Sequence, residues 1–158
     1  MRIVIASDPF AVALKDVVAE HLKQNGHEVI EVGPKKADDK IYYIEAASEL
    51  CETFKRKKCD KGVLICGTGA GVSIVANKHK GIYCVPCESA FTAYKAAQIN
   101  NANVISMGIN VVGPGNACYI VDTFLNSSFA VDGDDNRKKF LSGLLNQVYE
   151  LENKNFGE

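Results

Sequence analysis

Short apolar runs alternate along this chain with longer segments of helical period. The runs are rich in β-branched and other apolar residues, which is typical of strands buried on both faces of a parallel sheet. Parallel strands need crossover connections, and the helical segments between the runs can supply them. We therefore predict five parallel strands, at Arg2–Ser7, Glu28–Val32, Lys61–Cys66, Ile82–Pro86 and Asn103–Met107.

The segments between these strands predict helices on both faces of the sheet, which makes the chain a three-layer αβα domain. A length of 158 residues fits one such domain with a single continuous architecture. No internal repeat, low-complexity segment or interdomain linker interrupts it, so residues 1–158 are predicted to form a single domain. The expected helices are at about Phe10–Gln24, Ile41–Lys55, Gly71–Asn77, Ala90–Gln98, Pro114–Leu125 and Asp135–Glu152.

Charge and hydropathy argue against several classes of protein. Eighteen Lys and Arg residues balance nineteen Asp and Glu, whereas nucleic-acid binders usually carry a concentrated basic surface. The one basic cluster, residues 55–58, lies at the end of an expected helix and complements its dipole. The residues from Arg2 enter a strand pattern directly, unlike a signal peptide, and no apolar run approaches the roughly 20 residues that span a bilayer. We expect a cytoplasmic protein whose partner is a small molecule, not a nucleic acid or a membrane.

Six cysteines are scattered along the chain without the pattern of a disulfide framework, so we interpret them as buried thiols with one reactive member. Cys84-Val85-Pro86-Cys87 matches the C-x-x-C spacing. Redox pairs of this kind begin a helix, however, and here the two cysteines lie in an apolar strand whose side chains alternate between faces. The pattern favours neither redox chemistry nor zinc binding, and we expect no metal.

The sharpest local feature is the segment Cys66–Ser73 (CGTGAGVS), which joins a predicted strand to a predicted helix. Its glycines allow a tight turn that presents backbone N–H groups to an anion. The G-x-G-x-G spacing differs from the dinucleotide fingerprint, and no ribose-binding acid ends the next strand. Cys66 is the last strand residue, beside a helix N-terminus that can stabilise a thiolate. From the turn alone, Cys66 is either a base or a small apolar strand residue.

Over residues 1–129 the chain resembles the ribose-5-phosphate isomerase B and galactose-6-phosphate isomerase family. The resemblance rests on the segments Ile5–Asp8, Ile65–Lys78 with Gly81-Ile82, Asn100–Val104, Met107-Gly108 and Val111–Gly113. It implies a Rossmann-like fold, catalysis without a cofactor or metal, and proton transfer through a cis-enediolate. It also implies a homodimer or homotetramer whose active sites are shared between subunits, with the C-terminal helix, about residues 135–152, packing on the partner.

The resemblance also assigns roles by position. Cys66 is the base, Thr68 assists at the substrate hydroxyls, and backbone amides of the turn hold the enediolate oxygen. The expected substrate-binding residues are Asp8, Gly67, Gly69, Ala70, Gly71, Ser73, Asn100, Asn101 and Arg137.

Three of these assignments have structural alternatives. Asp8 precedes Pro9 and a helical segment, as a helix N-cap does. Asn100 and Asn101 can simply end a helix, and Arg137 can be an ordinary surface residue.

Departures from the family pattern bear on the substrate. Pro9 and Ile99 replace histidines of the family's ribose enzymes, and Asn110 and Gly133 replace arginines used for phosphate. A missing ring-opening acid is no defect for a tetrose 4-phosphate, which cannot close a five-membered ring. We therefore expect an aldose–ketose isomerase acting on a tetrulose 4-phosphate, as some family members do, or otherwise on ribose 5-phosphate. The alternatives are a subunit of a heteromeric galactose-6-phosphate isomerase and a non-catalytic sugar-phosphate-binding module.

Overall fold

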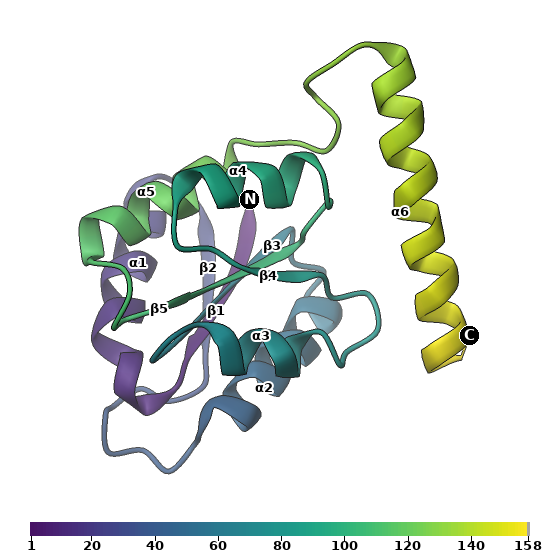
Figure 1. The fold of residues 1–158 in the computed structure, drawn as a ribbon. Helices are drawn as coiled ribbons and strands as arrows, with labels where there is room; N and C mark the ends of the chain where they lie inside the picture. The colour runs from purple at the N-terminus through teal and green to yellow at the C-terminus, as the bar shows by residue number, and fades with distance from the viewer. Residues whose placement is uncertain (158) are drawn as a thin grey trace.

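Five parallel strands form one central sheet in the computed structural model, which describes residues 1–157 (Figure 1). The strand order is β2-β1-β3-β5-β4, so β3 lies at the centre. The predicted α/β fold with five parallel strands is confirmed. The strands are β1 (Arg2–Ser7), β2 (Glu28–Val32), β3 (Lys61–Cys66), β4 (Cys84–Pro86) and β5 (Val104–Gly108).

Strand β4 begins two residues later than predicted, and asparagine side chains bond to the backbone around its start. The Asn77 amide donates to the Cys84 carbonyl and accepts from the Cys84 N–H, both at 2.8 Å. The Asn103 side chain likewise accepts from the Tyr83 N–H at 2.8 Å. The ladder with β5 starts at Cys84, which is paired with Val104.

Helices cover both faces of the sheet (Figure 1). Asp8 caps a short 3-10 turn, η1, before the first long helix, so the helix predicted from Phe10 is divided in two. The last helix continues four residues beyond the predicted end, to Phe156. The helical elements are η1 (Pro9–Ala11), α1 (Val12–Gln24), α2 (Tyr43–Arg56), α3 (Ala70–Ala76), α4 (Ala90–Gln98), α5 (Pro114–Leu125) and α6 (Asp135–Phe156).

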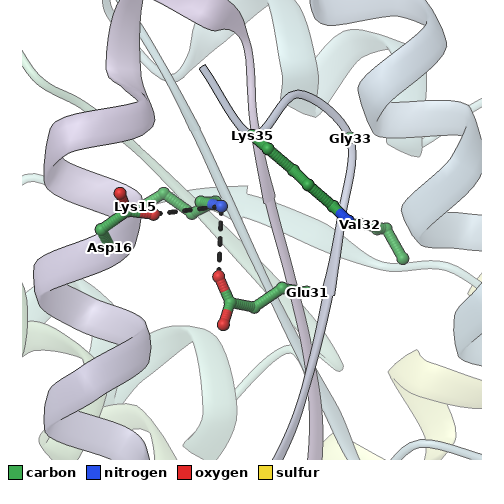
Figure 2. Close-up of a pocket in the computed structure, with 6 residues that line it drawn as sticks. All are labelled: Lys15, Asp16, Glu31, Val32, Gly33 and Lys35. Carbon is green, nitrogen blue, oxygen red and sulfur yellow. Dashed lines mark hydrogen bonds and ion pairs between the residues drawn. The ribbon is translucent and has the colours of Figure 1, made fainter. Parts of the chain in front are cut away.

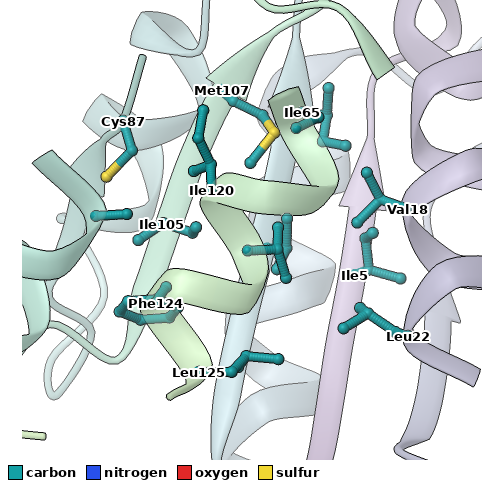
Figure 3. Close-up of a cluster of buried hydrophobic side chains, with 14 of the residues drawn as sticks. Ile5, Val18, Leu22, Ile65, Cys87, Ile105, Met107, Ile120, Phe124 and Leu125 are labelled. Atoms are coloured by element: carbon teal, nitrogen blue, oxygen red, sulfur yellow. The ribbon is translucent and has the colours of Figure 1, made fainter. Parts of the chain in front are cut away.

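Two apolar cores hold the three layers together, because successive strand residues point to opposite faces of the sheet. The larger core lies under α1, α4 and α5, where Ile5 and Ile105 of the sheet join Leu22 and Phe124 of the helices (Figure 3). The smaller core lies under α2 and α3 and includes Cys66 and Cys84. Both cores are continuous up to the strand ends, which gives the loops there a rigid base.

Helix α6 stands beside this body, and Leu141 is its one buried residue. Glu152 fastens it to the loop before β4 by accepting from the Gly81 N–H at 2.6 Å and the Tyr83 hydroxyl at 2.8 Å. An apolar stripe along the helix remains exposed, at Phe140, Leu144, Val148 and Leu151. No helix within residues 1–157 is long and apolar enough to cross a membrane.

Candidate active site

The loops after β1, β3 and β5 meet at the carboxyl edge of the sheet. The chain runs from β1 to β2 on one side and then places β3 on the other side of β1, which makes a topological switch point between β1 and β3. Ligands of open parallel sheets bind at such points, outside the carboxyl ends of the strands. Cys66 ends β3 there and is paired in register with Gly108 of β5.

The turn of residues 66–71, the Cys66 turn, is held tightly against the end of β5. Ile109 donates its N–H to the Cys66 carbonyl at 2.9 Å, and Asn110 donates to the Gly67 carbonyl at 3.1 Å. Gly69 has a φ of 83°, and a Cβ there would lie 2.9 Å from the Met107 carbonyl carbon. A Cβ on Gly108 would lie 2.5 Å from the Thr68 Cα. Glycine is therefore required on both sides of this contact.

The Cys66 thiol is 5% exposed and accepts a hydrogen bond from the Gly69 N–H, at 3.1 Å from N to Sγ. A backbone N–H directed at sulfur and the start of α3 just beyond it both stabilise a thiolate. The Thr68 side chain is exposed beside it, and its Oγ1 accepts from the Ala70 N–H at 3.4 Å. The structure thus places the predicted base and its predicted assistant on one turn.

The deeply buried cysteines elsewhere are poor candidates for a base. Burial raises the pKa of the Cys51, Cys84 and Cys87 thiols to about 12, so they remain protonated at neutral pH. Cys84 packs in the smaller core and Cys87 in the larger one. The two cysteines of the C-x-x-C segment therefore lie on opposite faces of the sheet, as the strand pattern predicts.

Asp8 is the N-cap that the sequence offered as its structural role, since its Oδ1 accepts from the Ala11 N–H at 3.0 Å. Partial burial raises the pKa of this carboxyl, and the N–H groups of Ala11 and Phe10 partly offset the rise. Its side chain also lines a hollow of about 260 Å³ together with Phe10, Tyr42 and Tyr43. Although Asp8 caps η1, its carboxylate still lies at the carboxyl edge of the sheet.

Tyr43 is a residue that the sequence did not point to. Its ring lies against the Cys66 turn, where a Cβ on Gly71 would be 3.1 Å from the ring carbons. Tyr43 begins α2 and is distant from Gly71 in the sequence. The one sequence feature that could have indicated it is the aromatic pair Tyr42-Tyr43, which is exposed in the structure.

Ser73 lies one turn into α3, and its side chain is directed at its own helix. The residue is 5% exposed, and its Oγ donates to the Ala70 carbonyl at 2.8 Å. The Ser73 hydroxyl proton is therefore used in a bond within the first turn of α3, and a substrate would have to compete with that bond.

Asn100, Asn101 and Arg137 are not brought to Cys66 of the same chain. The two asparagines lie between α4 and β5, at the amino edge of the sheet, and the Asn101 amide donates to the Tyr149 hydroxyl at 3.3 Å. Arg137 lies in the first turn of α6 with its side chain exposed. A role for these residues at a Cys66 turn requires a second subunit.

A second hollow, the Lys15 cavity, lies beside the end of β2 and has a volume of about 400 Å³ (Figure 2). Its lysine side chain is 3% exposed, and Nζ lies 3.1 Å from Asp16 Oδ1 and 3.2 Å from Glu31 Oε2. The other Glu31 oxygen lies 2.6 Å from Lys23 Nζ. Within residues 1–157, no group of three or more His, Cys, Asp or Glu side chains is arranged to hold a metal ion.

The known proteins that this chain resembles in sequence and in structure include several that are named as sugar isomerases. The sequence model of a family described as Ribose/Galactose Isomerase matches residues 3–140. A 4-deoxy-4-sulfo-D-erythrose isomerase of Clostridium sp. (strain MSTE9) is 33% identical over 96% of each chain. A D-erythrulose-4-phosphate isomerase of Pectobacterium atrosepticum is 35% identical over 84% of this chain and 88% of the relative. The solved structure of Clostridium thermocellum ribose-5-phosphate isomerase B superposes with a TM-score of 0.88 at 35% identity, covering 98% of this chain and 99% of that one.

Proposed function

Because the chain belongs to the ribose/galactose isomerase family, we propose that it interconverts an aldose phosphate and its ketose with Cys66 as the base. The observation that carries this proposal is the Gly69 N–H directed at the Cys66 sulfur, 3.1 Å away, at the carboxyl edge of the central strand. The Cys66 turn also offers an exposed hydroxyl, Thr68, and further backbone amides within a few residues of that sulfur.

In the proposed reaction the Cys66 thiolate removes the proton on C2 of the open-chain aldose. The C2–H electron pair forms the C1–C2 double bond, and the carbonyl electrons move onto O1. Negative charge thus develops on oxygen. We assign the backbone amides of Gly67, Ala70 and Gly71 to hold it, while the Gly69 amide donates to the Cys66 sulfur. The thiol then returns a proton to C1, while the proton on O2 moves to O1, with Thr68 positioned to relay it.

The substrate we propose is a four-carbon sugar carrying its anion on C4. Pro9 and Ile99 offer no acid for ring opening, and a tetrose 4-phosphate needs none because the hydroxyl that would close a five-membered ring is esterified. The names of the two relatives described above both refer to four-carbon sugars. The sugar named for the Clostridium relative carries a sulfonate in place of the phosphate. That relative matches 96% of this chain. A four-carbon sulfonate is therefore a second candidate.

We further propose that the active site is shared between two copies of the chain. Asn100 and Arg137 lie away from the Cys66 turn of their own chain, so a partner would have to present them. The exposed apolar stripe of α6, from Phe140 to Leu151, supports a helix that packs on a second subunit. Asp8 remains with its own chain's Cys66 turn as a binding residue for a substrate hydroxyl.

An activity screen of the purified protein tests the function. Tetrose and tetrulose 4-phosphates, the four-carbon sulfonate, ribose 5-phosphate and galactose 6-phosphate are each supplied at equal concentration, and product is followed through a coupled dehydrogenase. We expect the highest kcat/KM for a four-carbon substrate. A tenfold preference for ribose 5-phosphate or galactose 6-phosphate would reject the substrate proposal, and no isomerisation of any of them would reject catalysis by the single chain.

Mixing two inactive variants tests the shared site. Cys66→Ser and Asn100→Ala chains are each purified, mixed, and allowed to exchange subunits, which is verified by mass spectrometry of differently labelled copies. Hybrid dimers with one intact site are expected to restore activity to about a quarter of the wild-type level, since half of the dimers are hybrids and each has one of two sites intact. Verified exchange without recovery would contradict a shared site.

A further inference from the structure

Ser106 of β5 is fully buried directly beneath the Cys66 turn. It is paired in register with Leu64 of β3, two residues before the Cys66–Gly108 pair. Its side chain shares the sheet face of Val104, which belongs to the same core as Cys66, because every second strand residue points to one face. Its Oγ donates to the Gly69 carbonyl at 2.9 Å.

Gly69 is therefore held at both ends of its own backbone. Its carbonyl accepts from Ser106, and its N–H donates to Cys66 Sγ at 3.1 Å. Its φ of 83° lies in the left-handed region, which is one of several conformations open to glycine, so contacts with neighbouring groups select it. A bond that fixes the carbonyl also fixes the orientation of the residue that carries the N–H.

We propose that Ser106 is a positioning residue, which holds Gly69 so that its N–H stabilises the Cys66 thiolate. The inference rests on the proposed function only in one respect, namely that the Cys66 thiolate acts as a base. The geometric part, from the Ser106 hydroxyl through Gly69 to the sulfur, is independent of any substrate.

The neighbouring Cys84 thiol is compatible with this role. Burial raises its pKa to about 12, and the Ser106 hydroxyl partly offsets that rise. Cys84 therefore stays protonated and places no negative charge beside Ser106. The hydroxyl proton of Ser106 remains available for the Gly69 carbonyl.

Ser7 provides a matched control. It too is a fully buried strand serine near the carboxyl edge, but its Oγ has no hydrogen-bond partner within residues 1–157. Ser106→Ala and Ser7→Ala thus remove the same atom at the same depth, and only the first removes a bond to the Cys66 turn. Ser106→Thr keeps the hydroxyl.

The test follows the rate at which iodoacetamide alkylates Cys66 between pH 6 and pH 10, by peptide mass spectrometry, alongside isomerase kinetics. We expect Ser106→Ala to move the pH of half-maximal alkylation upward by about half a unit and to lower kcat about fivefold with KM nearly unchanged, as loss of one such bond implies. Ser106→Thr should restore most of both, and Ser7→Ala should change neither.

An alkylation profile in Ser106→Ala that coincides with the wild-type profile would overturn the proposal. So would a Ser106→Thr profile that coincides with that of Ser106→Ala. The alkylation measurement needs no substrate, so it decides the role of Ser106 even if the isomerase activity itself were not found.

Discussion

The Cys66 turn and the Lys15 cavity both lie at the carboxyl edge of the same sheet, and their polar groups are arranged differently. In the Lys15 cavity, the buried ammonium lies 3.1 and 3.2 Å from two carboxylates (Figure 2), and Glu31 is also paired with Lys23. The Lys15 charge is thus paired within the protein. At the Cys66 turn, one backbone N–H, that of Gly69, donates to the sulfur, and an exposed threonine lies beside it.

The arrangement of polar groups distinguishes a structural site from a reactive one, whereas the volume of a cavity does not. A buried charge that is already paired with close opposite charges binds a ligand weakly, because the ligand must first displace those partners. A backbone donor that is directed at a thiol and has no opposite charge beside it can stabilise negative charge that develops during a reaction. Changes at the Cys66 turn should therefore alter turnover, whereas changes at the Lys15 cavity should alter stability.

The largest effect is expected at the Cys66 sulfur itself. Cys66→Ser should lower kcat by at least about a thousandfold, because a hydroxyl is a far weaker base than a thiolate. Cys87→Ser makes the same change at a buried thiol on the opposite face of the sheet and should leave kcat within about threefold. Steady-state kinetics of the two variants checks this, and a Cys66→Ser enzyme with near-normal turnover would remove the distinction between the two regions.

A smaller loss is expected when the Cys66 turn is displaced without touching its side chains. A Cβ on Gly108 would lie 2.5 Å from the Thr68 Cα, so Gly108→Ala must push the turn away from β5. A shift of this kind should cost about 10- to 100-fold in kcat. Gly115→Ala, where a Cβ meets nothing within 4 Å, is the matched control and should retain normal turnover. Equal kinetics for the two variants would contradict the tight fit described for Gly108.

At the Lys15 cavity the expected effect is on folding. Lys15→Met should lower the free energy of unfolding by about 1–3 kcal/mol, because two carboxylates lose a buried partner while Glu31 keeps Lys23. Turnover should stay within about twofold. Denaturant unfolding is compared with that of Lys36→Met, an exposed lysine. A tenfold loss of kcat in folded Lys15→Met protein would place the cavity in the active site.

The smallest effect is a pH dependence of stability at Glu31. Its pKa is lowered, first by the hydrogen bond from Lys23 and then by that from Lys15, against the opposing effect of burial. A carboxyl with a lowered folded-state pKa stabilises the fold above its unfolded pKa, and this contribution is lost as pH falls through the folded value. The stability difference between the wild type and Glu31→Gln, measured by thermal unfolding, should therefore shrink as the pH falls from 6 toward 3. A difference that is constant or grows would contradict the assignment.

Much of the fold was predictable because its signals are local. Strands β1, β2 and β3 fall on the predicted residues, since each apolar run is bounded by polar or turn-forming residues. The start of β4 was predicted at Ile82 and lies at Cys84, where pairing with Val104 of β5 begins. A pattern of apolar residues in one strand does not show where its neighbour in the sheet begins to pair.

The site shows the same division. The position of Cys66 at a strand end, before a glycine turn, follows from the sequence. The bond from Gly69 to its sulfur, the hold of Ser106 on Gly69 and the contact of Tyr43 with Gly71 do not. The bond from Gly69 depends on the backbone conformation of the turn. The hold of Ser106 depends on β5 lying next to β3, and the Tyr43 contact depends on α2 reaching across to the turn.

Solvent deuterium exchange tests the central claim, that Cys66 moves the proton, most directly. The preferred sugar phosphate is incubated in D₂O with wild-type protein, and the signal of the hydrogen on the carbon beside the carbonyl is followed by proton NMR. We predict that the wild type replaces this hydrogen with deuterium during turnover, and that Cys66→Ser, although folded, does so at least about a thousandfold more slowly. Exchange by Cys66→Ser within tenfold of the wild-type rate would show that another group carries the proton and would contradict the account.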